Sequence, residues 1–408
     1  VVFSYEFNYD KYDFGGKTVT FVGWDSWPTD DPDFQEKKTL TEEKFNCKIE
    51  TVGLGWSDYV EKIMSRIIAD DSKYDVITML PKFFYPLVSE GMLYPVDEVL
   101  PPEYFESEFA SDHKIISFKG KRYGFYDSLG PGGLPMVIWN KDLFERQGLP
   151  NLYDLYDAGE WTWEKCEEVA TAATKDTDND GEIDQWGISY FYQFPSIFAM
   201  SNGVLPAIEK NGKIVFNMDS PEYLEALSTI YRWCQVENIA EPWLNKGAFQ
   251  DKKVAMTILK AGKGAKIKEN LDDQFGFVPM PMGPKADSYT FPKTGWMEPV
   301  IPMNAENPEA LIALRYYFDN EAVDEGLSDQ EKMIQNIAEA VCDEKSFQII
   351  MEAYNTWDGP FFPFLSITDA DDLRDNMNRV LIDGESPASV MEARKPLVQN
   401  KLDEYLNQ

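Results

Sequence analysis

The sequence predicts an α/β fold, because short β-branched segments alternate with segments whose apolar residues recur at helical intervals. The length of 408 residues favours two to three domains. An apolar content of 43% is sufficient for a buried core in each domain. No apolar run approaches the roughly 18 residues that a membrane-spanning helix needs. These observations together predict a folded protein built from more than one α/β domain.

The first series of elements begins at residue 17. Residues 17–22 are predicted to form a strand, residues 33–45 a helix and residues 47–52 a second strand. Ser57 is placed to cap a helix. The apolar face of that helix would consist of Val60, Ile63, Met64, Ile67 and Ile68. Residues 75–80 form a third strand, so the series predicts a parallel sheet covered by helices on both faces.

A second series begins near Val137, after a Gly/Pro-rich stretch at residues 130–135. Glycine permits the backbone changes that a hinge must absorb, so this stretch is the predicted crossing between domains. The predicted elements are a strand at 137–139, a helix at 140–147 closed by Gly148, a helix at 163–174 capped by Thr162, a helix from Ser220-Pro221 through Trp233, and a helix from Asn307-Pro308 through Phe318.

Aromatic residues concentrate where ligands bind in open α/β sheets, which is beyond the carboxyl ends of the strands. The loops at 23–28, 53–57 and 81–84 occupy those positions, and three tryptophans lie in the first two of these loops. A flat ring stacks on the apolar face of a sugar while a neighbouring carboxylate or amide binds its hydroxyls. The candidate ligand-binding residues are Trp24, Asp25, Trp27, Trp56, Lys82, Phe83, Asp127, Tyr190, Trp243, Trp296 and Trp357. By contrast, Trp139, Trp163 and Trp233 fall within predicted helices and strands, so we expect them in the core.

Residues 176–185 match the first part of an EF-hand calcium loop. They read DTDNDGEIDQ, with oxygen-bearing side chains at alternating positions and glycine at the sixth. Gly187 replaces the bidentate glutamate of position twelve, which lowers the expected affinity. The alternative is an Asx-turn that holds no ion. We predict a structural Ca²⁺ site with the candidate ligands Asp176, Asp178, Asp180, Glu182, Asp184 and Gln185.

The charge of the chain excludes several classes of partner. Lys and Arg number 38 and Asp and Glu number 71, so the formal net charge is 38 − 71 = −33. A surface of this sign repels phosphate backbones and anionic lipid headgroups, so we expect neither nucleic acid nor a membrane surface as a partner. Self-repulsion also favours a monomer.

The residue types of the commonest catalytic sites are scarce. His113 is the single histidine, which argues against a Ser-His-Asp triad and an HExxH zinc site. The motifs GxSxG, GxxxxGK[ST] and GxGxxG do not occur. Four dispersed cysteines form no CxxC pair and are expected to be buried, while their spacing leaves their disulfide state open. Carboxylates are so numerous that a glycosidase pair is neither supported nor excluded.

Several segments together resemble the extracellular solute-binding proteins of family 1, the sugar-binding receptors of ABC importers. The matching segments, in order, are residues 16–24 (GKTVTFVGW), 69–78 (ADDSKYDVIT), 138–144 (IWNKDLF) with 148–150 (GLP), 161–164 (WTWE), 247–249 (GAF) with 254–256 (VAM), 307–310 (NPEA) and 384–388 (GESPA). The resemblance implies a two-lobed, periplasmic-binding-protein-like fold with hinge-linked mixed, mostly parallel sheets. The implied lobes are residues 1–127 plus 296–345 and residues 128–295 plus 346–408.

The implied function is that of a receptor without catalysis, which captures a neutral oligosaccharide between its lobes by hinge closure. Its implied partners are ABC transporter permease subunits. The implied location is extracellular, with a lipid anchor upstream of Val1. Some relatives carry a calcium loop where residues 176–185 lie, and the turn at 293–296 matches the family's crossing, beside which Trp296 would face the ligand.

Two alternatives remain open. The first is an enzyme that acts on glycans, which would need a carboxylate pair in the cleft. The second is a receptor of the same shape for peptides or acidic sugars. Acidic sugars would require basic side chains, and only Lys82, Arg122 and Lys293 lie near the predicted loops, so neutral sugars are favoured.

Overall fold

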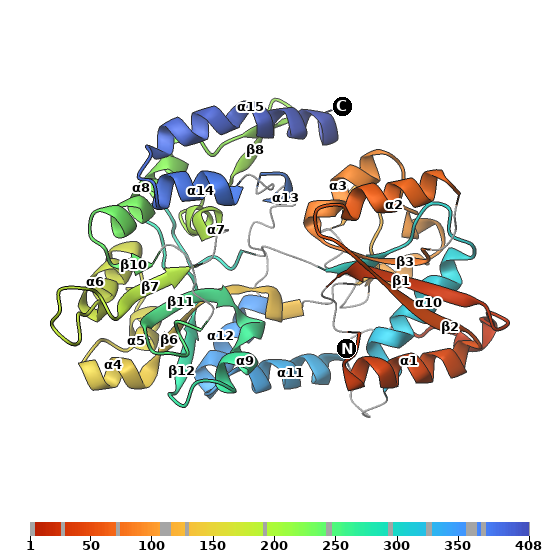
Figure 1. Cartoon of the computed structure of the whole chain (residues 1–408), viewed down its shortest axis with the longest axis horizontal. Helices are drawn as coiled ribbons and strands as arrows, with labels where there is room; N and C mark the ends of the chain where they lie inside the picture. The colour runs from red at the N-terminus through yellow and green to blue at the C-terminus, as the bar shows by residue number, and fades with distance from the viewer. Residues whose placement is uncertain are drawn as a thin grey trace. The chain divides into compact units, whose positions relative to one another are not determined.

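The chain divides into two compact units. The computed structural model describes residues 5–25, 29–70, 74–106, 116–126, 130–190, 194–241, 247–292, 297–323, 329–355, 365–368 and 373–407. Unit 1 comprises Val1–Gly130 and Gly295–Lys332, and unit 2 comprises Pro131–Thr294 and Met333–Gln408. Each unit is a sheet packed against helices (Figure 1). Within the described ranges, no helix is both long and apolar enough to span a membrane.

The sheet of unit 1 has four strands in the order β13-β3-β1-β2. They are β1 (Thr18–Trp24), β2 (Lys48–Leu54), β3 (Val76–Met79) and β13 (Glu298–Val300). β1 runs parallel to β2 and β3, and Val22 pairs with Val52 on one side and Ile77 on the other. The three predicted strands are therefore confirmed. β13 pairs antiparallel with β3, which makes the sheet mixed.

Helices cover both faces of this sheet. α1 (Pro32–Phe45) and α10 (Pro308–Asn320) lie on one face, and α2 (Tyr59–Ile68) and α3 (Pro81–Ser89) on the other (Figure 1). Phe21 of β1 packs edge-on against Phe318 of α10, with ring centroids 5.1 Å apart. The remaining short elements are η1 (Tyr9–Lys11), η2 (Val96–Glu98), η3 (Pro102–Glu106), β4 (Ser117–Phe118) and β5 (Lys121–Arg122).

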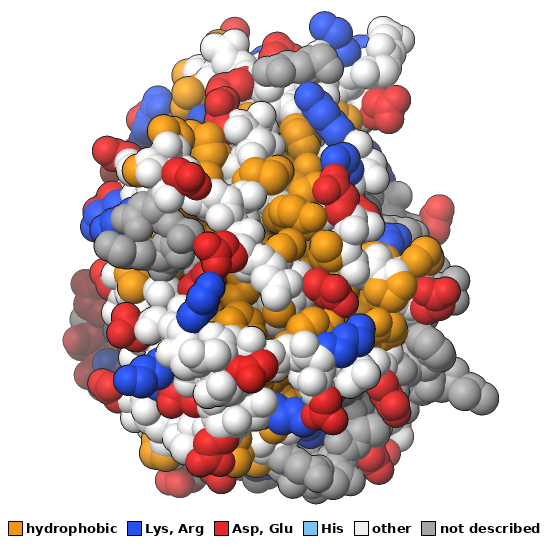
Figure 2. Space-filling model, turned by 90° about the vertical axis from the view of Figure 1, so that its right-hand side faces the viewer, with side chains coloured by type: hydrophobic (Ala, Val, Ile, Leu, Met, Phe, Trp, Pro, Cys, Tyr) orange, Lys and Arg blue, Asp and Glu red, His pale blue; other side chains and the backbone are white. Residues whose placement is uncertain are grey.

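Helix α2 differs from its prediction in two ways. It begins at Tyr59 with Asp58 in the N-cap position, so the predicted cap by Ser57 is wrong. Lys62 pairs with Asp58 at 2.6 Å across one helical turn. Of the predicted apolar face only Ile63 is fully buried, and Ile68 is 70% exposed. Figure 2 shows hydrophobic side chains gathered in a band on one face of unit 1.

The sheet of unit 2 has five strands in the order β10-β7-β11-β6-β12. They are β6 (Pro135–Asn140), β7 (Trp186–Tyr190), β10 (Ala240–Glu241), β11 (Val254–Lys260) and β12 (Phe275–Val278). β7 is parallel to β10 and β11, whereas β6 is antiparallel to β11 and β12. Two of its four pairings are antiparallel, so this sheet is mixed as well. Over the two sheets four of the seven pairings are parallel, which agrees with the expected mixed, mostly parallel sheets.

The predicted helix signals of unit 2 act as expected. Thr162 caps its helix by accepting from the Lys165 N–H, Ser220 caps by accepting from the Tyr223 N–H, and Gly148 ends its helix in the left-handed conformation at φ 66°. The helices are α4 (Lys141–Gln147), α5 (Leu152–Asp157), α6 (Trp163–Ala173), α7 (Phe194–Met200), α8 (Pro221–Gln235), α9 (Gly264–Lys268), α12 (Glu344–Asn355), α13 (Leu365–Thr368), α14 (Leu373–Leu381) and α15 (Pro387–Tyr405). Unit 2 also contains a hairpin, β8 (Ala207–Lys210) with β9 (Lys213–Phe216), and the 3₁₀ turn η6 (Ala261–Lys263). A second 3₁₀ turn, η5 (Gly130–Gly133), begins at the boundary with unit 1.

The division into units follows the implied lobes at two crossings and departs from them at the third. The crossings at Gly130/Pro131 and Thr294/Gly295 lie close to the implied positions after residues 127 and 295. The third lies at Lys332/Met333, inside α11 (Asp329–Ala340), rather than after residue 345. The segment after Lys332 contacts unit 2: Asp343, just beyond α11, forms an ion pair with Lys141 at 2.6 Å, and Lys268 donates to the Val341 carbonyl oxygen at 2.9 Å.

The predicted core residues are confirmed. Trp139, Trp163 and Trp233 are all nearly or fully buried. All four cysteines are free thiols, and Cys47, Cys166 and Cys234 are buried while Cys342 is half-buried. Burial raises the pKa of the Cys47 and Cys234 thiols to about 12, so these thiols stay protonated.

Candidate functional site

The carboxyl ends of the parallel strands of unit 1 bring two predicted loops together. β1 ends at Trp24 and β2 at Leu54, which pair with each other. The Asp25 N–H donates to the Leu54 carbonyl oxygen at 2.9 Å, so the start of the loop after β1 is held against the end of β2. A Cβ at Gly53 would lie 3.0 Å from the Asp25 Cα, so any other residue would push the two loops slightly apart. The half-buried Trp24 and the exposed Asp25 are thereby fixed at this edge.

An aromatic cluster lies at the same edge, and we call Trp56, Tyr59 and Phe83 the aromatic platform. Trp56 is 48% exposed and meets Phe83 edge-on, with ring centroids 5.0 Å apart. Phe83 is buried and stacks on Tyr59 at 4.4 Å. The Tyr59 hydroxyl donates to the Thr78 carbonyl oxygen of β3 at 2.7 Å. An exposed tryptophan is thus supported by two buried rings that are tied to the sheet.

Lys82 adds a positive charge to this cluster. Its Nζ lies 4.9 Å from the centroid of the Trp56 ring and 5.4 Å from that of Phe83. Both distances are within the range of cation–π attraction. The ammonium group therefore lies beside the half-exposed indole, within reach of any acceptor group that stacks there.

The structure brings three predicted ligand residues together and leaves others apart or undescribed. Trp56, Lys82 and Phe83 form one cluster, and Phe83 supports it from the core rather than facing solvent. Tyr59 of the platform was absent from the prediction, although a tyrosine at the first position of the helix that follows Trp56 is the signal that could have identified it. The predicted residues that lie outside the described ranges are Trp27, Asp127, Trp243, Trp296 and Trp357.

Tyr190 lies in the core of unit 2 rather than at a surface. Its side chain is fully buried and stacks on Phe194, with ring centroids 4.4 Å apart. Its hydroxyl contacts the Cys234 thiol. Burial raises the pKa of this phenol well above its ordinary value. A side chain with these contacts packs the interior, so it does not contribute a ligand-facing surface in this structure.

The calcium-like loop joins α6 to β7 and draws three carboxylates together. Oxygen atoms of Asp176, Asp178 and Asp184 lie within 4.8 Å of one another, and all three side chains are exposed. The Asn179 and Gly181 N–H groups donate to Asp176, and the Thr177 N–H and hydroxyl donate to Asp184. Those bonds from Thr177 hold the pKa of Asp184 below its ordinary value. Three exposed carboxylates whose oxygen atoms converge are a donor set that suits a hard cation such as Ca²⁺.

The other candidate ligands of this loop lie apart from the three carboxylates. Asp180 accepts from the Glu182 N–H at 2.8 Å, and neither carboxylate is among the group that converges. Gln185 is buried, donates to the Ala173 carbonyl oxygen and accepts from Gln147 at 2.9 Å. Its side chain therefore anchors the end of the loop to α4 and α6 and is directed away from the acidic cluster.

Comparison with known proteins identifies a family and a set of structural relatives. The family described as bacterial extracellular solute-binding protein matches residues 37–330. No curated protein matches the chain. Three solved structures are similar at TM-scores of 0.70, 0.70 and 0.69 and identities of 14%, 17% and 16%, and each alignment covers 94–96% of this chain and 99% of the other. They are an ABC substrate-binding protein from Listeria monocytogenes in complex with cycloalternan, a maltose/maltodextrin-binding domain from Bdellovibrio bacteriovorus bound to maltotriose, and the GacH receptor of Streptomyces glaucescens, solved unliganded and with acarbose. At these identities the likeness establishes the two-lobed fold.

Proposed function

Since the chain belongs to the bacterial extracellular solute-binding protein family, we propose that it is the receptor of an ABC importer for a neutral oligosaccharide. The family and the structural relatives are substrate-binding receptors rather than enzymes. In this proposal the sugar is captured between the two lobes by hinge closure. The closed protein then delivers it to the permease subunits without chemical change.

The observation that carries this proposal is the aromatic platform at the carboxyl edge of the unit 1 sheet. Trp56 has a half-exposed ring. The buried rings of Phe83 and Tyr59 fill the space beneath it, so the Trp56 ring stays at the surface. A rigid, half-exposed indole matches the apolar face of a pyranose. The exposed carboxylate of Asp25 at the same edge of the sheet supplies an acceptor for sugar hydroxyls.

The energetics of binding explain how a sugar would favour the closed state of the protein. A ligand shifts an open–closed equilibrium only by the difference between its affinities for the two states. A sugar that stacks on the aromatic platform and also contacts the second lobe has that difference, because only the closed state makes both sets of contacts. The relatives that bind cycloalternan, maltotriose and acarbose support an oligosaccharide as the cargo.

We also propose that the loop of Asp176, Asp178 and Asp184 holds a structural Ca²⁺. The ion would neutralise three carboxylates that otherwise repel one another at close range. Gln185 and Gln147 tie this loop to α4, so an ion held there would stiffen the start of β7. The loop lies in unit 2, so this role is separate from that of the aromatic platform in unit 1.

A thermal-shift screen tests the proposal. The protein, in calcium, is heated with neutral α- and β-linked oligosaccharides of two to six units, and each mixture is then examined for reaction products. A ligand that binds only the folded state raises Tm by mass action. We expect one glycan class to raise Tm with no product formed. Product formation would support a glycan-active enzyme and overturn the receptor proposal.

An acidic sugar is the second candidate cargo, and Lys82 is the observation that favours it. The ammonium beside Trp56 could pair with a uronate carboxylate, and such a charge-assisted contact weakens with added salt. Lys82→Met separates the two candidates. Loss of affinity on substitution together with strong salt dependence indicates an acidic sugar, whereas little change in either indicates a neutral one.

A further inference from the structure

The chain passes between the two units at three places, and the structure describes two of them in full. The first is Gly130/Pro131 in η5, and the third is Lys332/Met333 inside α11. Residues on both sides of each of these two crossings are described. The elements of unit 2 that receive these two segments therefore show what holds the crossings in place.

The first crossing rests on η6 through a contact between two glycines. β6 and β11 are paired so that Pro135 lies opposite Lys260, and the Ala261 N–H donates to the Leu134 carbonyl oxygen at 2.8 Å. This pairing brings η5 onto η6. A Cβ at Gly262 would lie 3.1 Å from the Gly132 carbonyl oxygen and 3.2 Å from its Cα. These separations are too short for an ordinary side-chain contact, so the two backbones touch with no side chain between them.

The third crossing rests on the helix that follows η6. α11 ends at Ala340, and a Cβ at Gly264, the first residue of α9, would overlap the Ala340 carbonyl oxygen. Lys268, the last residue of α9, donates from Nζ to the Val341 carbonyl oxygen at 2.9 Å. Both ends of α9 therefore hold the end of α11. On the side of unit 1, Lys332 donates to the Asn320 carbonyl oxygen at the end of α10 at 2.6 Å.

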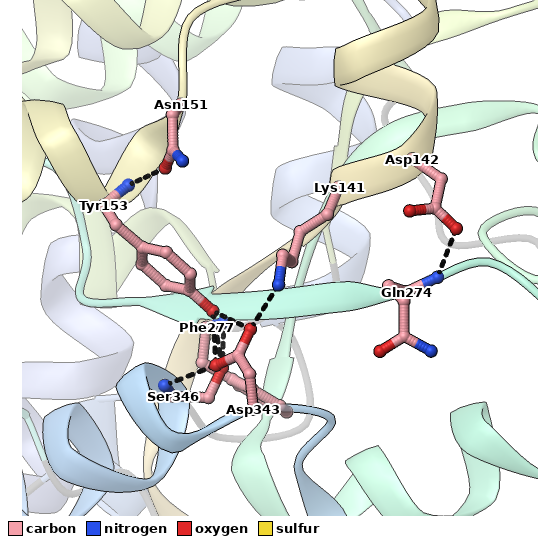
Figure 3. Close-up of polar contacts among 8 residues, drawn as sticks. All are labelled: Lys141, Asp142, Asn151, Tyr153, Gln274, Phe277, Asp343 and Ser346. Atoms are coloured by element: carbon pink, nitrogen blue, oxygen red, sulfur yellow. Dashed lines mark hydrogen bonds and ion pairs between the residues drawn. The ribbon is translucent and has the colours of Figure 1, made fainter.

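Directly after this contact the chain is fixed to the sheet of unit 2 (Figure 3). Asp343 accepts from Lys141 at 2.6 Å and from the Tyr153 hydroxyl at 2.9 Å. Ser346 contacts the same hydroxyl at 2.7 Å and accepts from the Phe277 N–H of β12 at 3.1 Å. Burial opposes ionisation of Asp343, but the bonds from Lys141, the Ser346 N–H and Tyr153 hold its pKa below the ordinary value. The start of α12 is therefore a fixed point from which α11 extends back to unit 1.

We infer that residues 261–268, which we call the hinge seat, position two of the three crossings and so set the open–closed equilibrium of the protein. The inference rests on the proposed function, because it presumes that the lobes close. Gly262 and Gly264 are its positioning residues, since each allows a crossing segment to approach closer than any other residue would. If the hinge seat shifts, both crossing segments shift with it, because this short, continuous stretch of chain contacts both of them.

The test is a comparison of Gly262→Ala with Gly132→Ala. The two substitutions add the same methyl group to the two sides of one contact. At Gly262 the new Cβ meets backbone atoms at 3.1 and 3.2 Å and must displace the crossing, whereas at Gly132 its nearest neighbour is the Gly262 Cα at an ordinary 3.5 Å. Gly132→Ala is therefore a matched control for the loss of a glycine at the hinge.

The readout is the distance between the units in the absence of ligand. Dyes are attached through unnatural amino acids at the exposed positions Ser65 in α2 and Ser228 in α8, and energy transfer is measured on single molecules. We expect Gly262→Ala to shift the transfer distribution and to weaken binding of a sugar that stabilises the wild type by about threefold or more. We expect Gly132→Ala to change neither. Because the distribution is measured without ligand, the inference is tested even if no sugar binds.

Lys268→Met provides a second variant in case Gly262→Ala does not fold. It removes the bond to Val341 while the side chain stays exposed, so the end of α11 loosens and the distribution is expected to broaden. Wild-type distributions in both Gly262→Ala and Lys268→Met would overturn the inference. Equal shifts in Gly132→Ala and Gly262→Ala would overturn it as well, because they would assign the effect to glycine flexibility rather than to the contact.

Discussion

Trp56 is the side chain through which the proposed function is most directly tested. It is half-exposed, and its contact with Phe83 leaves surface for a ligand. Aromatic stacking contributes about 0.5–1.5 kcal/mol beyond area burial, so Trp56→Ala should weaken binding of a stabilising sugar by about tenfold. Calorimetry measures this change. Trp56→Phe keeps a ring at the position and should retain most of the affinity.

The control for Trp56 is Ile68→Ala, which removes another exposed apolar side chain from the same unit. It should leave sugar affinity unchanged. Wild-type affinity in Trp56→Ala would contradict the assignment of the aromatic platform as a sugar-binding surface. Equal losses in Trp56→Ala and Ile68→Ala would do so too, because they would indicate a general effect on unit 1.

The location of a residue in the fold could be predicted from the sequence where its position at the end of a strand is enough to determine it. Trp56 and Lys82 follow strands of a parallel sheet, so their convergence at one edge could be expected from the order of the elements. Tyr190 also ends a strand, but its ring turns into the core against Phe194. Gln185 ends an acidic loop, but its amide turns inward to Gln147. The direction of a side chain depends on packing partners that are distant in sequence, and spacing does not contain them.

The loop between α6 and β7 carries the first prediction at the scale of an element. Asp176→Asn with Asp178→Asn removes two of the three converging carboxylates and should abolish stabilisation by calcium. A calcium concentration of a hundred times Kd raises the free energy of unfolding by about 2.7 kcal/mol. The wild type should therefore melt several degrees higher in calcium than in chelator. Differential scanning calorimetry in both conditions measures this difference.

The chelator condition provides the control for the loop. Without calcium the double variant should be at least as stable as the wild type, because two repelling charges are gone. Sugar affinity should change little in either condition. A wild type whose Tm is the same in calcium and in chelator would contradict the proposed ion site.

The junction of β1 and β3 carries a pH-dependent prediction. Asp75, just before β3, accepts from the Thr20 N–H of β1 at 2.7 Å. Burial raises the pKa of Asp75 to about 6 from 3.8, despite that bond. The folded state therefore binds the proton more tightly than the unfolded state. The contribution of Asp75 to stability is greatest below pH 4 and falls as the pH rises to about 6.

Asp75→Asn should therefore stabilise the protein at neutral pH. The amide oxygen can still accept from Thr20 without a buried charge, so the gain at pH 7 should be about 1–3 kcal/mol and should vanish near pH 4. Denaturant unfolding across this pH range measures the gain. Asp287→Asn, which makes the same change at an exposed carboxylate, is the control and should change stability little. A gain that is the same at pH 4 and pH 7 would contradict the assigned cause.

Elements were predicted well where a local signal determines them. Thr162, Ser220 and Gly148 begin or end their helices as their capping chemistry predicts. Ser57 failed as a cap because Asp58, the next residue, occupies the N-cap position. Mixed sheets were expected, but which strands pair antiparallel, here β6 and β13, was not predicted, because strand direction depends on the path of the connections rather than on local composition.

The charge of the whole molecule predicts a salt effect. With a formal net charge of −33, self-repulsion acts against the folded state. Screening shortens from about 30 Å at 0.01 M salt to about 8 Å at 0.15 M salt, so added salt should raise Tm. Screening depends on ionic strength and not on the identity of the cation. Sodium chloride and potassium chloride should therefore raise Tm equally when a chelator is present to remove calcium. A Tm that falls with added salt would show that attractive ion pairs outweigh the repulsion.

The two-unit organisation was largely predictable from the resemblance, whereas the last boundary was not. The end of α11 belongs to unit 2, and the pair Lys141–Asp343, which contacts the chain just beyond it, joins residues some two hundred positions apart in the sequence. No local feature near residue 333 marks that change, because the crossing lies inside a continuous helix. The hinge seat could not be predicted from the sequence either, because the role of its glycines depends on close contacts with segments that are distant along the chain.

Calorimetric titration with the sugar that most stabilises the protein, followed by mass analysis of the recovered sugar, tests the central claim most directly. The account predicts saturable binding at one site per chain, recovery of the sugar unchanged, and a loss of about tenfold in affinity for Trp56→Ala. Hydrolysed or transferred sugar would contradict the receptor function. Binding that is indifferent to Trp56 would contradict the site.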